Sequence, residues 1–221
     1  MIVFSPHPDD MALGCGGTIA KKASEGFEVY LVMLTDGRHA FTHRLGITVE
    51  PSPEEVKQMR KAEFMKAAGI LGVPEKNLVF FDYEDGTLAE HEREVEERAI
   101  EIIEKYWPAD MYYPFRRDCH PDHRATNRIV RGALQRLRYA GSYEYTITHT
   151  YAHLGPLVEK FLSILRRNEV GEEISAFVAL KERALDTYES EMTIISSKQK
   201  EPLHKSVKKF LRSKEVFRES K

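Results

Sequence analysis

The chain has 221 residues, of which 42% are hydrophobic and 31% are charged, and its formal net charge is -2. This length and composition suit one globular domain with a sizeable core, and the near-neutral charge gives no general reason to expect a nucleic-acid partner. No apolar run approaches the roughly 20 residues that span a bilayer, so we expect no membrane span.

The composition also indicates where the protein works. No basic segment or cleavage site precedes the first apolar run, so we expect no signal peptide. The two cysteines, Cys15 and Cys119, cannot form a disulfide framework, which favours the cytoplasm. Three Asn and three Gln among abundant Lys, Arg and Glu are typical of a thermophile. From Lys198 onward, nine Lys/Arg stand against three Glu, which we interpret as a solvated helix, with an anion-binding tail as the alternative.

Short apolar runs alternate with helical periods along the chain. Strands are predicted at 2–4, 28–34, 78–81, 110–114 and 143–151. Helices are predicted at 17–25, 53–72, 90–106, about 124–138, 156–167, 176–189 and 202–212, with a long polar loop at 38–53. This order predicts an α/β fold: a Rossmann-like, doubly wound and mostly parallel sheet with flanking helices and extra C-terminal helices. No repeat or linker interrupts it, so we expect a single domain over 1–221.

One imidazole and two carboxylates follow the first predicted strand within four residues: His7, Asp9 and Asp10. Prolines at 6 and 8 hold the residue before each of them extended, so the polar groups are displayed on a stiff segment. Open α/β sheets bind ligands outside the carboxyl ends of their strands. We interpret this turn as half of a metal site.

A second polar cluster follows the fourth predicted strand: His120, Asp122 and His123. Both clusters fall at the same end of a parallel sheet, so we expect them to meet. Two imidazoles and one carboxylate, with open positions left over, suit a catalytic Zn²⁺ or a non-haem Fe²⁺. The remaining carboxylate of the Asp9–Asp10 pair and the remaining histidine are then available for acid–base work.

Three motifs together resemble a known family. Ser-Pro-His-Pro-Asp-Asp at 5–10, Gly-Cys-Gly-Gly-Thr at 14–18 and His-Pro-Asp-His at 120–123 resemble the zinc-dependent N-acetylglucosaminyl deacetylases of the PIG-L/LmbE-like superfamily. Weaker matches extend the resemblance over most of the chain: Thr35-Asp36-Gly37, Arg60 to Glu63, Leu71-Gly72-Val73, Asp85-Gly86, Lys181 to Leu185, Tyr188 to Ser190 and Glu215 to Phe217.

The resemblance implies a role for each residue of the two clusters. Three side chains hold the metal, which is Zn²⁺ or another divalent ion: His7, Asp10 and His123. Asp9 is the general base that takes a proton from the metal-bound water. His120 is the imidazolium that stabilises the oxyanion, and Asp122 orients it.

The resemblance also implies a reaction, which is removal of an acetyl group from an N-acetylglucosamine-containing small molecule or oligosaccharide. Arg60 and Asp85 are expected to touch the sugar hydroxyls. Taken alone, Arg60 is equally well explained as a helical i,i+3 partner of Glu63, and Asp85 as a turn residue. Many members of the family carry Glu where this chain has Met11. Because Met11 lies outside the implied ligand set, this difference concerns the choice of substrate or the surroundings of the ligands and not metal binding itself. Relatives often form trimers or hexamers, so a homo-oligomer is expected.

Two other readings stay open. Gly14-x-Gly16 follows a strand and Asp36 lies about 20 residues further on, as in a dinucleotide-binding module. Against that reading, the third glycine position is Ile19, and the acidic turn repels a pyrophosphate. The second alternative is a metal-binding protein without activity, against which the presence of Asp9 and His120 argues.

Overall fold

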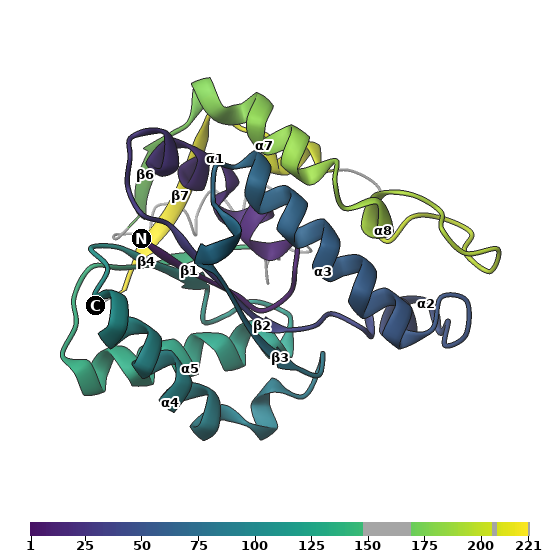
Figure 1. Ribbon diagram of the computed structural model, residues 1–221, viewed down its shortest axis with the longest axis horizontal. Coiled ribbons are helices and arrows are strands. Elements are labelled where there is room, and N and C mark those ends of the chain that lie inside the picture. Colours follow the sequence, from purple (N-terminus) through teal and green to yellow (C-terminus); the bar gives the residue numbers. More distant parts are fainter. Residues whose placement is uncertain (148–168, 205–206, 221) are drawn as a thin grey trace, which may run out of the picture.

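A seven-stranded sheet forms the middle of the molecule in the computed structural model, which describes residues 1–147, 169–204 and 207–220 (Figure 1). The strands lie in the order β3-β2-β1-β4-β5-β7-β6. Their bounds are Ile2–Ser5 (β1), Tyr30–Thr35 (β2), Leu78–Tyr83 (β3), Met111–Pro114 (β4), Ser142–Tyr145 (β5), Glu169–Glu173 (β6) and Lys214–Glu219 (β7). The strands from β3 to β5 pair in parallel, whereas β7 runs antiparallel to both of its neighbours. The predicted α/β, mostly parallel, doubly wound sheet is therefore confirmed.

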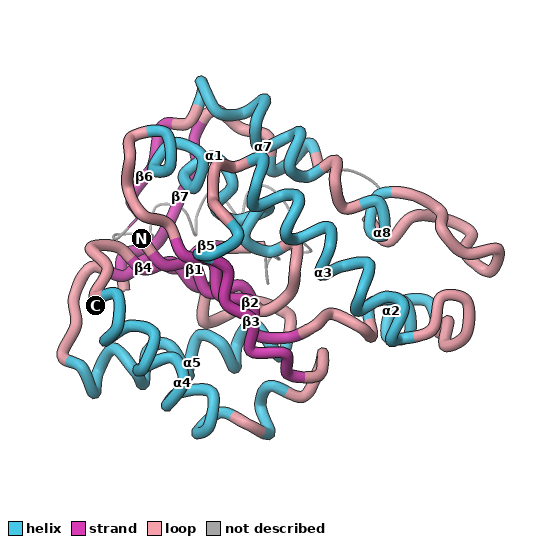
Figure 2. The backbone as a smooth tube through the Cα atoms, in the orientation of Figure 1, coloured by secondary structure: helices cyan, strands magenta, loops and turns pink. Residues whose placement is uncertain are grey.

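Helices cover both faces of this sheet (Figure 2). On one face lie α1 (Asp10–Ser24), α3 (Pro53–Ile70) and α7 (Val178–Leu185), and on the other lie α4 (Glu92–Tyr106) and α5 (Pro121–Leu137). Two short helices, α2 (Ala40–Leu45) and α8 (Glu189–Met192), lie near the end of α3. Single 3₁₀ turns occur at Glu75–Asn77, Leu88–Glu90, Ser175–Phe177 and Lys208–Phe210. Each face of the sheet thus has its own apolar core.

The first strand and the long helices follow from local sequence. β1 is buried along its whole length, as a strand covered on both faces must be. α3 begins with a capping box, in which the Ser52 side chain and the Glu55 backbone and side chain bond reciprocally, and with Pro53 in its first turn. α4 buries one apolar stripe, which includes Val95 and Ile103.

The first helix begins earlier than predicted, at Asp10 rather than at Gly17. Gly14 therefore lies inside α1, where a Cβ atom would come within 2.5 Å of the Tyr145 ring. The glycines of this stretch allow close packing of the helix and do not mark its start. The predicted loop 38–53 was also too long, since it contains α2.

The C-terminal prediction was wrong. A helix was expected at 202–212 and a solvated helical end, but the described residues there form a 3₁₀ turn followed by strand β7. Side chains of β7 alternate, with Glu215 and Phe217 buried and Val216 exposed. The inward-facing residue is charged, so the alternation is not visible as apolar periodicity. The helix predicted at 156–167 and the end of the strand predicted at 143–151 lie outside the described residues.

No membrane-spanning element was found: none of the helices in the described part of the chain combines the length and the apolar character that crossing a bilayer requires.

Candidate metal centre

The two predicted clusters meet at the carboxyl ends of β1 and β4, which are neighbours in the sheet. The helix after β1 packs on one face of the sheet and the helix after β4 on the other. Open α/β sheets bind ligands at such a switch point. His7 lies in the turn between β1 and α1, and His123 lies in the first turn of α5. Asp85, which follows β3, reaches the same place. The fold thereby brings His7 and His123, which are 116 residues apart in the sequence, to hydrogen-bond distance.

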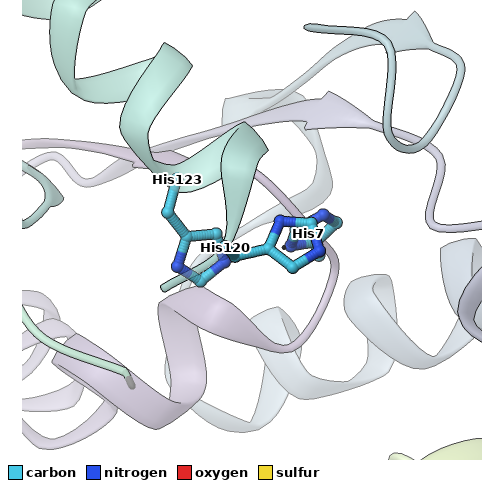
Figure 3. A group of neighbouring side chains, drawn as sticks. All are labelled: His7, His120 and His123. Carbon is cyan, nitrogen blue, oxygen red and sulfur yellow. Dashed lines mark hydrogen bonds between the residues drawn. The ribbon is translucent and has the colours of Figure 1, made fainter. Parts of the chain in front are cut away.

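Three donor atoms form a nearly equilateral triangle. His7 Nδ1 lies 3.0 Å from Asp10 Oδ2 and 3.2 Å from His123 Nε2, and His123 Nε2 lies 3.1 Å from Asp10 Oδ2. One ring nitrogen from each of His7, His120 and His123 also lies within 4.8 Å of the others. Figure 3 shows the three imidazole rings gathered between the start of α5 and the turn before α1.

The triangle fits a metal ion. With bonds of about 2.0 Å, the ligand atoms of tetrahedral zinc lie about 3.3 Å apart, close to the separations found here. Two imidazole nitrogens and one carboxylate oxygen are donors that suit zinc and leave a fourth position open. His7, Asp10 and His123 can therefore hold one divalent cation.

Two carboxylates face the other nitrogen of His7. His7 Nε2 lies 3.3 Å from Asp85 Oδ1 and 3.3 Å from Asp122 Oδ2. Asp122 also accepts the backbone N–H groups of Gly86 and Leu88. A proton on Nε2 is stabilised by these acceptors, which leaves the Nδ1 lone pair for a metal.

The resemblance implied that Asp85 contacts the sugar and that Asp122 orients His120, whereas in the structure both carboxylates lie beside His7 Nε2. The described hydrogen bonds of the Asp122 carboxylate go to His7 and to backbone groups, not to the His120 ring, which instead accepts the backbone N–H of Asp122.

Asp118 is a site residue that sequence reasoning missed. Its Oδ1 lies 3.1 Å from His123 Nδ1 and accepts the backbone N–H of His120 at 3.1 Å. It is buried, and it lies within ion-pair distance of the outer nitrogen of His123, as Asp85 and Asp122 do of that of His7. Its position two residues before His120 in the Asp-Cys-His-Pro-Asp-His run was the available signal.

Electrostatics favour positive charge at this centre. Burial opposes protonation of His7 and His123, but the surrounding carboxylates outweigh it. The pKa of His7 is raised well above its usual value, mainly by hydrogen bonds with Asp10, Asp122 and Asp85. Asp10 and Asp118 raise the pKa of His123 to about 9. Although burial opposes it, His123 and His7 hold the pKa of Asp10 well below its usual value. A site that attracts protons in this way also attracts a divalent cation.

His120 behaves differently from the other two histidines. Burial, followed by repulsion from His7 and His123, lowers its pKa to about 4. The ring is therefore neutral at pH 7 in this structure, whereas the resemblance implied an imidazolium. Because Nδ1 accepts the Asp122 backbone N–H, the neutral ring carries its proton on Nε2.

Asp9 is bound by Arg60. Arg60 Nη2 donates to Asp9 Oδ1 at 2.8 Å and lies 2.8 Å from Glu191 Oε1, while Nη1 donates to the Gly37 carbonyl. Glu63, the expected helical partner of Arg60, instead accepts two hydrogen bonds from Ser190. The carboxylates raise the pKa of the buried Arg60 guanidinium against the effect of burial, so it stays charged.

A pocket of about 140 Å³ opens over this centre. Its lining includes seven of the eight predicted site residues: His7, Asp9, Asp10, Arg60, Asp85, His120 and His123. Asp122 lies behind His7. The lining also contains residues that sequence reasoning did not assign to the site: Ala40, His43, Arg44, Ile147, Glu191 and His204.

The family model described as "PIG-L: GlcNAc-PI de-N-acetylase" matches residues 2–134, which contain both clusters. The chain belongs to this family. The match covers the strands β1 to β4, the helices between them and most of α5, so it includes every residue that carries a donor atom of the triangle.

Individual PIG-L relatives extend the similarity. The chain is 30% identical over 198 residues to a diacetylchitobiose deacetylase of Thermococcus kodakarensis, covering 86% of this chain and 69% of the relative. It is 31% identical over 140 residues to a probable N-acetyl-alpha-D-glucosaminyl L-malate deacetylase 2 of Bacillus cereus, covering 62% and 61%. The solved structure of N,N'-diacetylchitobiose deacetylase from Pyrococcus horikoshii aligns with a TM-score of 0.71 at 24% identity, covering 98% and 82%, and supports the fold.

The PIG-L assignment disfavours the dinucleotide alternative, and the geometry agrees. A dinucleotide fingerprint places its glycines in the turn before a helix, but Gly14 and Gly16 lie inside α1. Asp36, the candidate ribose ligand, is 1% exposed and bonds to Arg38.

Proposed function

We propose that this chain is a metal-dependent hydrolase that removes the acetyl group from the nitrogen of an N-acetylglucosamine-containing small molecule or oligosaccharide. The observation that carries the proposal is the donor triangle of His7, Asp10 and His123, which shares one pocket with Asp9 and His120. The deacetylase names of the relatives support the choice of reaction.

We assign the metal to His7, Asp10 and His123, with Zn²⁺ as the ion favoured by two imidazoles and one carboxylate. A divalent cation there supplies Lewis-acid polarisation of the amide carbonyl and acidifies a water molecule. Asp85 and Asp122 orient His7, and Asp118 orients His123.

Asp9 acts as the general base. Its Oδ1 is bound to Arg60, and no donor from the described residues lies within hydrogen-bond distance of Oδ2. Oδ2 therefore takes the proton of the attacking water. The water oxygen bonds to the carbonyl carbon, the carbon–nitrogen bond breaks, and Asp9 returns the proton to the leaving amine, which gives acetate and a free amino sugar.

His120 stabilises the negative charge that develops on the carbonyl oxygen. Its neutral ring carries a proton on Nε2, which makes it a hydrogen-bond donor toward the pocket. Arg60 and Asp85 line the same pocket, so each can contact a sugar hydroxyl in addition to holding its protein partner.

The test is acetate release from a panel of sugars: N-acetylglucosamine, diacetylchitobiose and N-acetylglucosaminyl malate. The purified protein is measured as isolated, after chelation, and after zinc is restored. We expect release from at least one sugar, its loss on chelation and its return with zinc. Full zinc loading without acetate release from any sugar, or release that resists complete metal removal, contradicts the proposal.

Two further expectations concern location and assembly. We propose a cytoplasmic homo-oligomer, a trimer or a hexamer of the 25.5 kDa chain. The free state of Cys15 and Cys119 supports a reducing compartment. Light scattering on the purified protein tests the assembly, and a monomer mass contradicts it.

A further inference from the structure

The C-terminal part of the chain reaches the turn that carries the base. The buried Tyr188 hydroxyl donates to the Pro8 carbonyl at 2.7 Å, directly beside Asp9. Ser190 bonds to Glu63 through both its backbone N–H and its hydroxyl, which ties the start of α8 to α3. These contacts place the residues that follow Ser190 at the wall of the catalytic pocket.

Glu191 shares the Arg60 guanidinium with Asp9. Arg60 Nη2 lies 2.8 Å from one oxygen of each carboxylate, and Arg60 and Glu191 are 3% and 2% exposed. The Gly37 carbonyl fixes Nη1 from a third side. With three acceptors around it, the guanidinium has one orientation, and Asp9 Oδ1 is held in place by it.

His204 closes the other side of the same group. Its Nε2 lies 3.5 Å from Glu191 Oε2 and 3.7 Å from Asp9 Oδ2, and its backbone N–H donates to the Glu191 carbonyl at 2.8 Å. The ring is partly exposed and lines the pocket. His204 therefore faces the Asp9 oxygen that Arg60 leaves free.

Asp9, Glu191 and His204 also have the spacing of a metal site, with one ligand atom from each within 4.8 Å of the others. A second metal ion is nevertheless disfavoured, because the Arg60 guanidinium already places a positive charge within 2.8 Å of both carboxylates. The group is better explained as a holder for Asp9.

We propose that Glu191 and His204 are positioning residues of the catalytic base: Glu191 fixes Arg60 against Asp9 Oδ1, and His204 limits the rotation of Asp9 Oδ2 toward the pocket. The inference rests on the proposed role of Asp9. It implies that the C-terminal segment beyond the matched 2–134 region completes the active site.

Alanine variants test the proposal against matched controls. Glu191→Ala and His204→Ala are each expected to lower kcat about 10- to 100-fold, as a misplaced catalytic group does, with KM changed less than about twofold. Bound zinc per chain stays at the wild-type level. His204→Gln keeps an N–H donor and recovers most of the lost kcat. Glu189→Ala, an exposed residue on the same helix, retains wild-type kinetics.

Each contrary result has a definite meaning. A raised KM with unchanged kcat makes these residues substrate contacts, and loss of zinc or of cooperative melting in the alanine variants makes them structural. Failure of His204→Gln to recover activity makes His204 a proton carrier. Each of these outcomes overturns the proposal.

Crystal structures of the variants provide a readout that is independent of turnover. The Asp9 Oδ1–Arg60 Nη2 contact is expected to be lost in Glu191→Ala, and the Asp9 carboxylate is expected to rotate in His204→Ala. An unmoved Asp9 in both variants overturns the positioning role. If the wild-type protein releases acetate from no sugar, the proposed function fails, and the crystal structures still decide the positioning role.

Discussion

Asp10 and Asp118, the carboxylates beside His123, lead us to predict that the metal-free protein loses stability as the pH rises. The pKa of His123 is about 9 in the folded chain, against an ordinary value of 6.5. A raised folded-state pKa contributes stability that is fully present below pH 6.5 and is lost as the pH rises through 9. Between these two pH values the change is about 2 to 3 kcal/mol, which for a chain of this size lowers the melting temperature by about 5 to 10 °C.

The assay is a series of melting curves of chelated protein from pH 6 to 9.5, repeated with saturating zinc and with the His123→Asn variant. Zinc needs the unprotonated ring, so the fall is expected to disappear or reverse in the loaded protein. The variant lacks the group and is expected to show a shallower fall than the wild type, because His7 remains. Chelated wild-type protein with a flat profile, or with the same profile as His123→Asn, would refute the assignment of this charge to His123.

Three other predictions concern the site and its support. Asp9→Asn is expected to bind zinc at the wild-type level but to lose at least about 100-fold in kcat, measured by acetate release and metal analysis; zinc loss in this variant would make Asp9 a ligand. Asp85→Asn is expected to weaken zinc binding about 10- to 100-fold in a competition titration, because the acceptor beside His7 Nε2 loses its negative charge; unchanged affinity would remove Asp85 from the support of the metal. Lys181→Met breaks a buried ion pair with Glu215 and is expected to cost about 3 to 5 kcal/mol in a denaturant melt, whereas a loss below about 1 kcal/mol would show that Glu215 finds another partner.

Sequence reasoning succeeded where the signal was local. Buried parallel strands appear as short apolar runs. Prolines and acidic first turns mark where helices begin, and the glycines that follow the last turn mark where helices end. The two polar clusters could be placed together because each follows a strand, and parallel strands end at one edge. The triangle of His7, Asp10 and His123 needed no information beyond that topology and the resemblance.

The C-terminal strand could not be predicted because its core position is a charge. Glu215 is 6% exposed and accepts hydrogen bonds from the Gly17 and Thr18 backbone and from Lys181. The residue at this position is polar, so Lys214–Glu219 shows no alternation of apolar and polar residues. The partner that makes burial of Glu215 tolerable lies 34 positions away, and nothing in the sequence joins the two.

The same limit applies to the charges around Asp9. An Arg and a Glu three residues apart on a helix predict a surface ion pair. Arg60 and Glu63 have this spacing on α3, but they do not bond to each other. Each instead bonds to α8, Arg60 through Glu191 and Glu63 through Ser190. The pair thus serves as two anchor points for a distant segment. Because α8 also carries the residue that shares Arg60 with Asp9, the contacts that fold the C-terminal segment onto α3 are the same contacts that orient the base. A change in that segment is therefore expected to alter turnover even where it leaves the metal in place.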